Sequence, residues 1–313
     1  MAGNTVSTLS LAKRAEVWSS ELSEILRDEL QGMKYVNWLA DFPDGDTFKI
    51  PSLGDATINN YTEDAAVTYD ALDDAQFTFA ITEYLQAGNY ITRKAEQDVF
   101  YANQIMSQFV PLQERALMER LETDIMARQG DQIGADANTI NGAAHRMIGS
   151  GASNAIGVAD FAKALHSLKV GKVPQRNLVA IVDPSVEYEL NTLSNLTNVS
   201  NNPKWEGIVN SGIATGMDFV ANIYGFDVYT SNYLADIASE TIGATTVTGA
   251  KANMFFSAES TVLPFVGAWR QMPRVDTEFN KDYQRTEFVT TARYGVKLQR
   301  PENLVTVLST PTV

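Results

Sequence analysis

The chain has 313 residues, of which 44% are hydrophobic and 20% charged, so it has enough apolar material for a core and is not disordered throughout. It contains no cysteine, which excludes disulfides, thiol nucleophiles and cysteine-bound metals. The net charge is −14, which argues against a grip on nucleic acid or on an anionic membrane, because both need clustered basic residues. No apolar run is long enough for a transmembrane helix.

Residues 10–31 are predicted to form an amphipathic helix. Leu11, Trp18, Leu22 and Ile25 recur at helical spacing, and Gly32 ends the pattern. At this position in the chain, the helix is either a docking arm or a part of the core.

Residues 44–92 are predicted to form a long two-stranded excursion with an acidic tip. Its ends alternate apolar and polar residues, as Phe77, Phe79 and Ile81 illustrate, whereas its middle is short of large apolar side chains. The stretch 45–92 carries eight acidic residues against one lysine, a net charge of −7. A long hairpin is marginally stable alone in water, so we expect this excursion to lie on another surface.

Residues 93–129 give the strongest helix prediction. Strong helix formers accompany apolar residues at spacings of three to four and longer multiples, namely Val99, Ala102, Met106, Phe109, Leu117, Leu121 and Ile125. At ~1.5 Å per residue this is a rod of roughly 55 Å, which is typical of a strut.

The remainder is predicted to be mixed α/β and then rich in strands. A helix over 158–170, a buried strand over 178–182 and a helix opened by Asp183-Pro184 precede strands over 252–256, 287–298 and 304–308. The last stretch, 263–313, has a net charge of +2, opposite in sign to the acidic excursion.

The sequence contains no constellation that indicates catalysis or a cofactor. His145 and His166 have no second ligand at metal spacing, and phosphate-loop, zinc-protease and nucleophile-elbow motifs are absent. We therefore expect no catalytic residue, no metal and no cofactor. Carboxylates are abundant, so a hydrolase that uses a pair of acids remains open, as does a soluble binding protein.

The order of these parts resembles the major capsid protein of tailed bacteriophages, with the HK97-type fold. Residues 86–129 are similar to that family's loop return and spine helix. Three short segments resemble its patterns in the same order: VPQRNLVAIVDP (173–184), IYGFDVYTSNYL (223–234) and RYGVKLQRPE (293–302). Each pattern is weak alone, and their agreement in order is what carries the resemblance.

The resemblance implies an α+β capsid fold and a non-enzymatic shell subunit. The expected parts are an N-terminal arm (1–43), an extended loop (44–92), a peripheral domain with the spine helix (93–134), an axial domain (135–262) and the peripheral C-terminal strands (263–313). The expected partners are copies of the chain itself, in the hexamers and pentamers of an icosahedral head around double-stranded DNA. A separate scaffolding protein and a portal are expected as well, a decoration protein is compatible, and sequence-specific nucleic-acid binding and membrane contact are not expected. The virion is the expected location, after assembly in the host bacterial cytoplasm.

The same resemblance predicts where subunits meet. The extended loop of one subunit is expected to lie on the basic C-terminal region of the next, through an apolar face (Phe77, Phe79, Ile81) and through opposed charges. The acidic candidates are Asp70, Asp73, Asp74 and Glu83, and the basic candidates are Arg270, Arg274, Arg285 and Arg293. An encapsulin-like bacterial nanocompartment is the alternative within the same fold.

Overall fold

A computed structural model describes residues 30–39, 47–53, 58–60, 62–64, 66, 74–98, 102–132, 138–192 and 222–311. The helix predicted over 10–31 lies outside the described residues, apart from positions 30 and 31. Asp70 and Asp73 of the acidic excursion also lie outside them.

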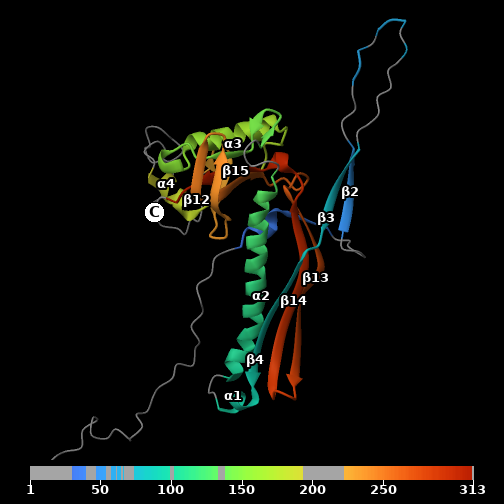
Figure 1. Cartoon of the computed structure of the whole chain (residues 1–313), viewed down its shortest axis with the longest axis vertical. Coiled ribbons are helices and arrows are strands. Elements are labelled where there is room, and N and C mark those ends of the chain that lie inside the picture. Colours follow the sequence, from blue (N-terminus) through green and yellow to red (C-terminus); the bar gives the residue numbers. More distant parts are fainter. Residues whose placement is uncertain are drawn as a thin grey trace, which may run out of the picture.

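A long helix packs along a four-stranded sheet in the lower part of Figure 1. The helix is α2 (Ala102–Ala127), preceded by the short α1 (Arg93–Asp98). The strand order is β1-β13-β14-β4, with bounds β1 (Val36–Leu39), β13 (Phe265–Asn280), β14 (Arg285–Leu298) and β4 (Glu83–Thr92). β1 is parallel to β13, and the other pairs are antiparallel. We call this the first sheet.

The apolar stripe of α2 explains its position. Leu117, Leu121 and Ile125 are buried, and Leu121 and Ile125 join Tyr294 and Leu298 of β14 in one core cluster. The helix continues through Pro111 without interruption. The predicted rod is thus confirmed as helix over 93–98 and 102–127, and residues 99–101 are not described.

A seven-stranded second sheet forms the upper part of the molecule. Its order is β7-β15-β12-β8-β10-β9, with β11 paired to β12. The bounds are β7 (Arg146–Ile148), β8 (Leu178–Val182), β9 (Asn222–Ile223), β10 (Phe226–Thr230), β11 (Asp236–Ile242), β12 (Thr245–Ser257) and β15 (Val305–Ser309). Short elements complete the molecule: η1 (Gly32–Tyr35), η2 (Arg128–Asp131), η4 (Ala152–Asn154), η6 (Pro301–Asn303), β5 (Thr139–Ile140) and β6 (Ala143–Ala144).

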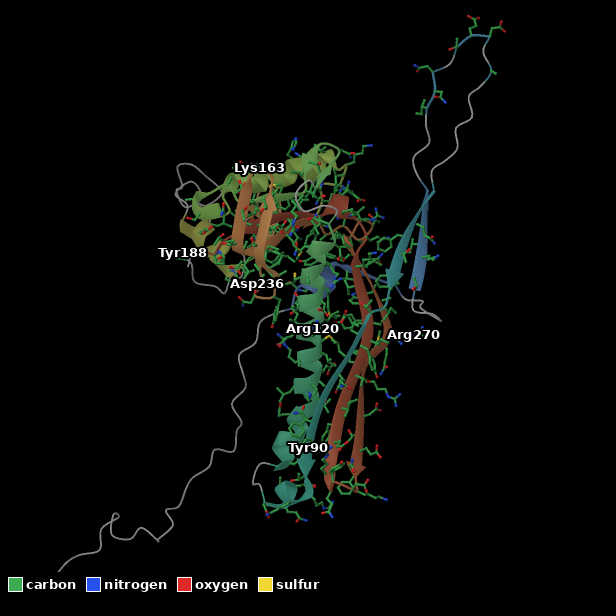
Figure 2. All side chains as sticks on the ribbon, viewed as in Figure 1. Tyr90, Arg120, Lys163, Tyr188, Asp236 and Arg270 are labelled. Atoms are coloured by element: carbon green, nitrogen blue, oxygen red, sulfur yellow. The ribbon has the colours of Figure 1, made fainter. Side chains whose placement is uncertain are left out.

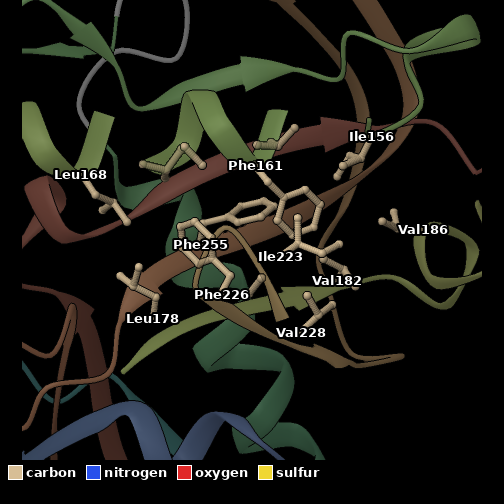
Figure 3. Close-up of a cluster of buried hydrophobic side chains, with 14 of the residues drawn as sticks. Ile156, Phe161, Leu168, Leu178, Val182, Val186, Ile223, Phe226, Val228 and Phe255 are labelled. Carbon is tan, nitrogen blue, oxygen red and sulfur yellow. The ribbon is translucent and has the colours of Figure 1, made fainter. Parts of the chain in front are cut away.

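Both faces of the second sheet are covered, which explains why every residue of β8 and β15 is buried. On one face α3 (Val158–Val170) and α4 (Pro184–Thr192) pack over a core in which the rings of Phe161, Phe226 and Phe255 meet edge to face (Figure 3). On the other face, Ile181 and its neighbours pack in one cluster with the end of α2. The two sheets therefore share a continuous core around the C-terminal end of α2.

A separate two-stranded hairpin projects from this body. It consists of β2 (Thr47–Leu53) and β3 (Asp74–Ala80), and Figure 1 shows it rising away from both sheets. The α+β class and the two-stranded excursion are thus confirmed. The excursion is shorter than expected, because residues 83–92 form β4, an edge strand of the first sheet.

The C-terminal region requires a second correction. Residues 263–313 were expected to form one strand-rich unit, but β13 and β14 belong to the first sheet and β15 to the second. The physical reason is burial: every residue of β15 is buried, as in β8, so this strand fits only inside a sheet that is covered on both faces.

Candidate assembly interface

The base of the projecting hairpin crosses the first sheet at Gly295. A Cβ atom added to Gly295 would lie 2.7 Å from the carbonyl oxygen of Ala80 and 3.0 Å from the Cα of Ile81. Glycine is needed here because the backbone that follows β3 passes directly over β14. Gly295 therefore fixes the point from which the hairpin leaves the body.

Apolar contacts and one lysine hold this crossing. Phe79 is fully buried and Ile81 nearly so, both against Val266 and Ala268 of β13. The expectation that they face a neighbouring subunit is thus wrong for these two residues, because their own chain already covers them. Phe77 is only partly buried at the margin of the same cluster.

Lys297 secures the hairpin from the side of β14. Its Nζ donates a hydrogen bond of 3.0 Å to the carbonyl oxygen of Thr78 and lies 5.1 Å from the centroid of the Phe77 ring. The hairpin base is therefore held by a polar and a cation–π contact as well as by burial.

Below the crossing, the same face of the first sheet is open. The strand register places Arg274, Arg285 and Arg293 on this outer face, because they pair with Thr291, Asn280 and Gln271 of the neighbouring strand. On β4, Tyr84 pairs with Arg293 and Tyr90 with Glu287, so both tyrosines share the face. They are 62% and 57% exposed. We call this surface, made of Tyr84, Tyr90, Arg274, Arg285, Glu287 and Arg293, the outer face.

Arg274 and Arg285 each form an ion pair with a carboxylate of their own chain. Arg285 lies 2.5 Å from Glu287, and its guanidinium stacks over Tyr90 and Tyr283 at 4.4 and 4.7 Å from the ring centroids. Arg274 lies 3.1 Å from Asp276. Both arginines therefore offer less net charge to a partner than the sequence suggests.

Arg270 is exposed at an irregularity of β13, between Trp269 and Gln271, and Figure 2 shows it pointing away from α2. Among the acidic candidates, Asp74 is the first residue of β3 and pairs with Leu53. Glu83 pairs with Tyr294, whose side chain faces α2, so it does not share the face of the arginines. It was expected in the extended loop, but it is the first residue of β4 and so belongs to the first sheet.

The opposite, inner face of the first sheet is fixed to α2 by hydrogen bonds. Gln113 donates to the carbonyl oxygen of Phe288 at 3.0 Å and to Asn89 at 2.8 Å, and it accepts a hydrogen bond of 2.7 Å from Thr290. Tyr294 donates to Asp124 at 2.6 Å. Burial and this hydrogen bond both raise the pKa of Tyr294, so it stays a neutral donor. The outer face is therefore backed by a rigid layer.

A buried carboxylate fixes the place where the N-terminal segment joins the body. Glu122 of α2 accepts hydrogen bonds from the backbone N–H groups of Gln31, at 2.9 Å, and Gly32, at 2.7 and 2.8 Å. Burial raises the pKa of Glu122, although these N–H groups partly oppose the shift. Glu122 thus attaches Gln31 and Gly32 to the spine helix.

Arg146 links the second sheet to the end of α2. Arg146 of β7 makes two hydrogen bonds to Glu240 of β11, at 2.6 and 2.8 Å, and a third, at 2.5 Å, to the side chain of Gln129 in η2. Arg146 is buried and Glu240 nearly so. These contacts connect the end of α2 to the second sheet.

The sequence analysis missed three features of this region. The tyrosines at positions 84 and 90 occupy the outward positions of β4, and the alternation over 83–92 is the signal that could have found them. Glu122 and Arg146 gave no signal, because their partners lie about ninety residues away in the chain.

The described residues contain no group of three or more side chains that could hold a metal ion. Among the described helices, none is long and apolar enough to cross a membrane.

Comparisons with known proteins agree with this architecture. Residues 54–307 match the model of a family described as phage capsid protein, whereas no curated protein matches the chain. A solved capsid of Cyanophage P-SCSP1u superposes with a TM-score of 0.73 at 14% identity, covering 98% of this chain and 94% of that one.

A solved chain of Mycobacterium phage Che8 gives a TM-score of 0.68 at 18% identity, with coverages of 94% and 96%. The capsid of Ralstonia phage GP4 gives a TM-score of 0.68 at 11% sequence identity, and the superposition covers 99% of each chain. Identities this low show the fold, and the family match covers most of the sequence. The chain therefore belongs to the phage capsid protein family, and it is a shell subunit of a tailed-phage head with the HK97-type fold.

Proposed function

We propose that the chain is a non-catalytic subunit that closes into an icosahedral head of hexamers and pentamers around double-stranded DNA. The observation that carries this proposal is the β2–β3 hairpin, which is anchored at Gly295 and extends away from its own body (Figure 1). An anchored projection of this kind contributes little to the core of its own chain and can reach a neighbour. In this assignment the first sheet with α2 is the peripheral domain, and the second sheet with α3 and α4 is the axial domain.

The hairpin of one subunit would cover the open part of the outer face of the next. In its own chain, the hairpin base already occupies the upper part of that face, over Val266, Ala268 and Gly295. On the hairpin side, Ile58 is 92% exposed in the single chain. Burying Ile58 and the two tyrosines would contribute roughly 25 cal/mol per Å² of apolar surface, which outweighs the charge contribution.

The charges would add specificity. Arg270, Arg274, Arg285 and Arg293 remain the candidates to face Asp70, Asp73 and Asp74 of a neighbour, and Arg274 and Arg285 would have to share their charge with Asp276 and Glu287 of their own chain. Each exposed pair contributes only ~0.2–1 kcal/mol. Because a closed shell repeats the contact in every subunit, the small free-energy contributions of the ion pairs add up over the particle.

Negative-stain electron microscopy of the purified protein tests the shell itself, and closed particles or capsomers are the expected result. Compact monomers under all assembly conditions would contradict it. Particles that contain nucleic acid support a phage head, whereas particles filled with a cargo enzyme would support the encapsulin-like alternative.

A charge swap tests the proposed contact. Asp73→Lys with Asp74→Lys is expected to block assembly or to alter its dependence on salt, and Arg293→Glu is expected to restore part of it. The matched control is Glu96→Lys with Asp98→Lys, which makes the same change of charge in α1. If the two double variants assemble alike at low salt, the acidic residues serve only solubility.

We further propose that a separate scaffolding protein and a portal take part in assembly, that a decoration protein can bind the finished head, and that assembly takes place in the host cytoplasm. The resemblance of the whole chain to this class of shell supports these partners. Co-expression with the neighbouring structural genes of the phage, followed by particle sizing, tests them.

A further inference from the structure

The exposed side of α3 is basic in an otherwise acidic protein. Between Phe161 and Val182 the sequence contains no aspartate or glutamate, while the whole chain has a net charge of −14. The basic residues of this stretch are Lys163, Lys169, Lys172 and Arg176, accompanied by His166. All five side chains are exposed.

The helix geometry aligns these side chains. Lys163, His166 and Lys169 follow one another at steps of three residues, which keeps them on one side of α3. Phe161, Ala164 and Leu168 occupy the opposite side and are buried against the second sheet (Figure 3). Lys163 lies on the helix that covers this sheet (Figure 2). We call the row Lys163, His166, Lys169, Lys172 and Arg176 the basic row.

Carboxylates neutralise this row only at its start. Asp160 is buried and lies 3.1 Å from Lys163, and it also accepts hydrogen bonds from the backbone N–H groups of Ser150 and Gly157. Burial acts to raise the pKa of Asp160, but these hydrogen bonds outweigh it and lower the pKa, so Asp160 is ionised. Within the described part of the chain, no carboxylate oxygen lies within 4.0 Å of Lys169, Lys172 or Arg176.

The surroundings of the basic row distinguish two kinds of partner. Protein–protein interfaces contain an apolar or aromatic centre. Among the described residues, no exposed large hydrophobic side chain falls between residues 151 and 182. A surface that offers spaced cations without an apolar centre suits a phosphate backbone.

We infer that the basic row contacts the phosphates of the nucleic acid packaged inside the shell, without reading its sequence. From Lys163 to Lys169 the helical part of the row spans about 9 Å along the axis of α3, and successive phosphates of one DNA strand rise ~3.4 Å along the duplex. The row can therefore lie along a few consecutive phosphates. Contact is weak for each subunit, because the rest of the subunit repels DNA, so the genome stays free to move in and out. This inference rests on the proposed shell function.

A salt titration tests the contact directly. Binding of a short labelled DNA duplex to the purified unassembled subunit is followed by fluorescence anisotropy at increasing salt. Lys169→Gln with Lys172→Gln is expected to reduce the slope of log affinity against log salt by about two, because each phosphate that is no longer neutralised removes ~0.9 from the slope. The matched control, Lys94→Gln with Lys281→Gln, removes the same charge from exposed sites in α1 and the β13–β14 turn and should leave the slope unchanged.

The inference would be overturned by no binding at the lowest salt, by equal slopes for the two double variants, or by a reconstruction of assembled shells in which α3 faces outward. A basic-row variant that fails to close shells while its control closes would assign the row to a neighbouring subunit, and would also overturn it. Failure of the proposed function is recognised separately, because the wild-type protein would then form no shells.

Discussion

At the scale of single residues, the most consequential side chain is a carboxylate buried beside backbone amides. The Glu122 carboxylate accepts hydrogen bonds from the backbone N–H groups of Gln31 and Gly32. A Cβ atom added to Gly32 would lie 2.9 Å from Glu122 Oε2. A side chain at position 32 would therefore require the Glu122 carboxylate to shift. The spine helix thereby determines where the N-terminal segment enters the body.

Glu122→Gln is expected to change how stability depends on pH. The pKa of Glu122 is raised above its ordinary value of 4.5, so the folded chain binds this proton more tightly than the unfolded chain does. Its contribution to the free energy of unfolding therefore falls as the pH rises through the range between the two pKa values. Urea unfolding at several pH values should show the variant gaining stability relative to the wild type across that range. A difference that is constant with pH would contradict this explanation.

Gly295→Ala is expected to destabilise the chain by ~1–3 kcal/mol and to displace the hairpin base, because the new methyl group would collide with the Ala80 carbonyl. Gly88→Ala in β4 is the control, since its nearest atom would be Val289 Cγ2 at an ordinary 3.8 Å. Thermal unfolding of both variants measures the difference. Equal melting temperatures of the two variants would contradict the close contact between Gly295 and the backbone of the hairpin base.

At the scale of elements, the stripe of α2 was predictable because helical periodicity is a local property. Leu121→Asp places an unpaired charge in the core and is expected to cost more than ~3 kcal/mol. Leu112→Asp, on an exposed turn of the same helix, should cost far less. Soluble yield and the urea midpoint of unfolding distinguish the two variants. If the Leu121→Asp protein folds and assembles normally, the conclusion that this side of α2 is part of the core is wrong.

The pairing of strands was not predictable in the same way. The alternation of apolar and polar residues predicted strands over 77–81 and 287–298, but it does not indicate which strands pair with one another. The apolar side chains of Phe79 and Ile81 were therefore assigned to a neighbouring subunit, although Val266 and Ala268 cover them. The arginines of the outer face were found from charge alone, whereas their pairing with Asp276 and Glu287 depends on the register of the folded sheet.

At the scale of the whole molecule, Arg146 of the second sheet bonds to Gln129 at the end of α2 and is itself paired with Glu240 of its own sheet. Arg146→Met leaves the nearly buried Glu240 without a partner and is expected to cost about 3 kcal/mol, whereas adding Glu240→Leu should recover most of this loss. Arg274→Met, which breaks an exposed pair, should cost under ~1 kcal/mol. Urea unfolding checks all three variants, and a double variant no better than the single one would contradict the explanation.

The two sheets close with strands from the far end of the chain. Val36 of β1 pairs with Phe265 of β13, and β15 lies between β7 and β12. During synthesis, neither sheet can be completed until residues beyond 264 have left the ribosome, and the second must wait for residues 305–309. Pairings this distant in sequence fold slowly and leave strand edges open in the meantime. A chain that stops before residue 265 lacks β13 and β14 and with them most of the outer face, so under the proposed contact truncated chains would be kept out of the growing particle without any separate inspection.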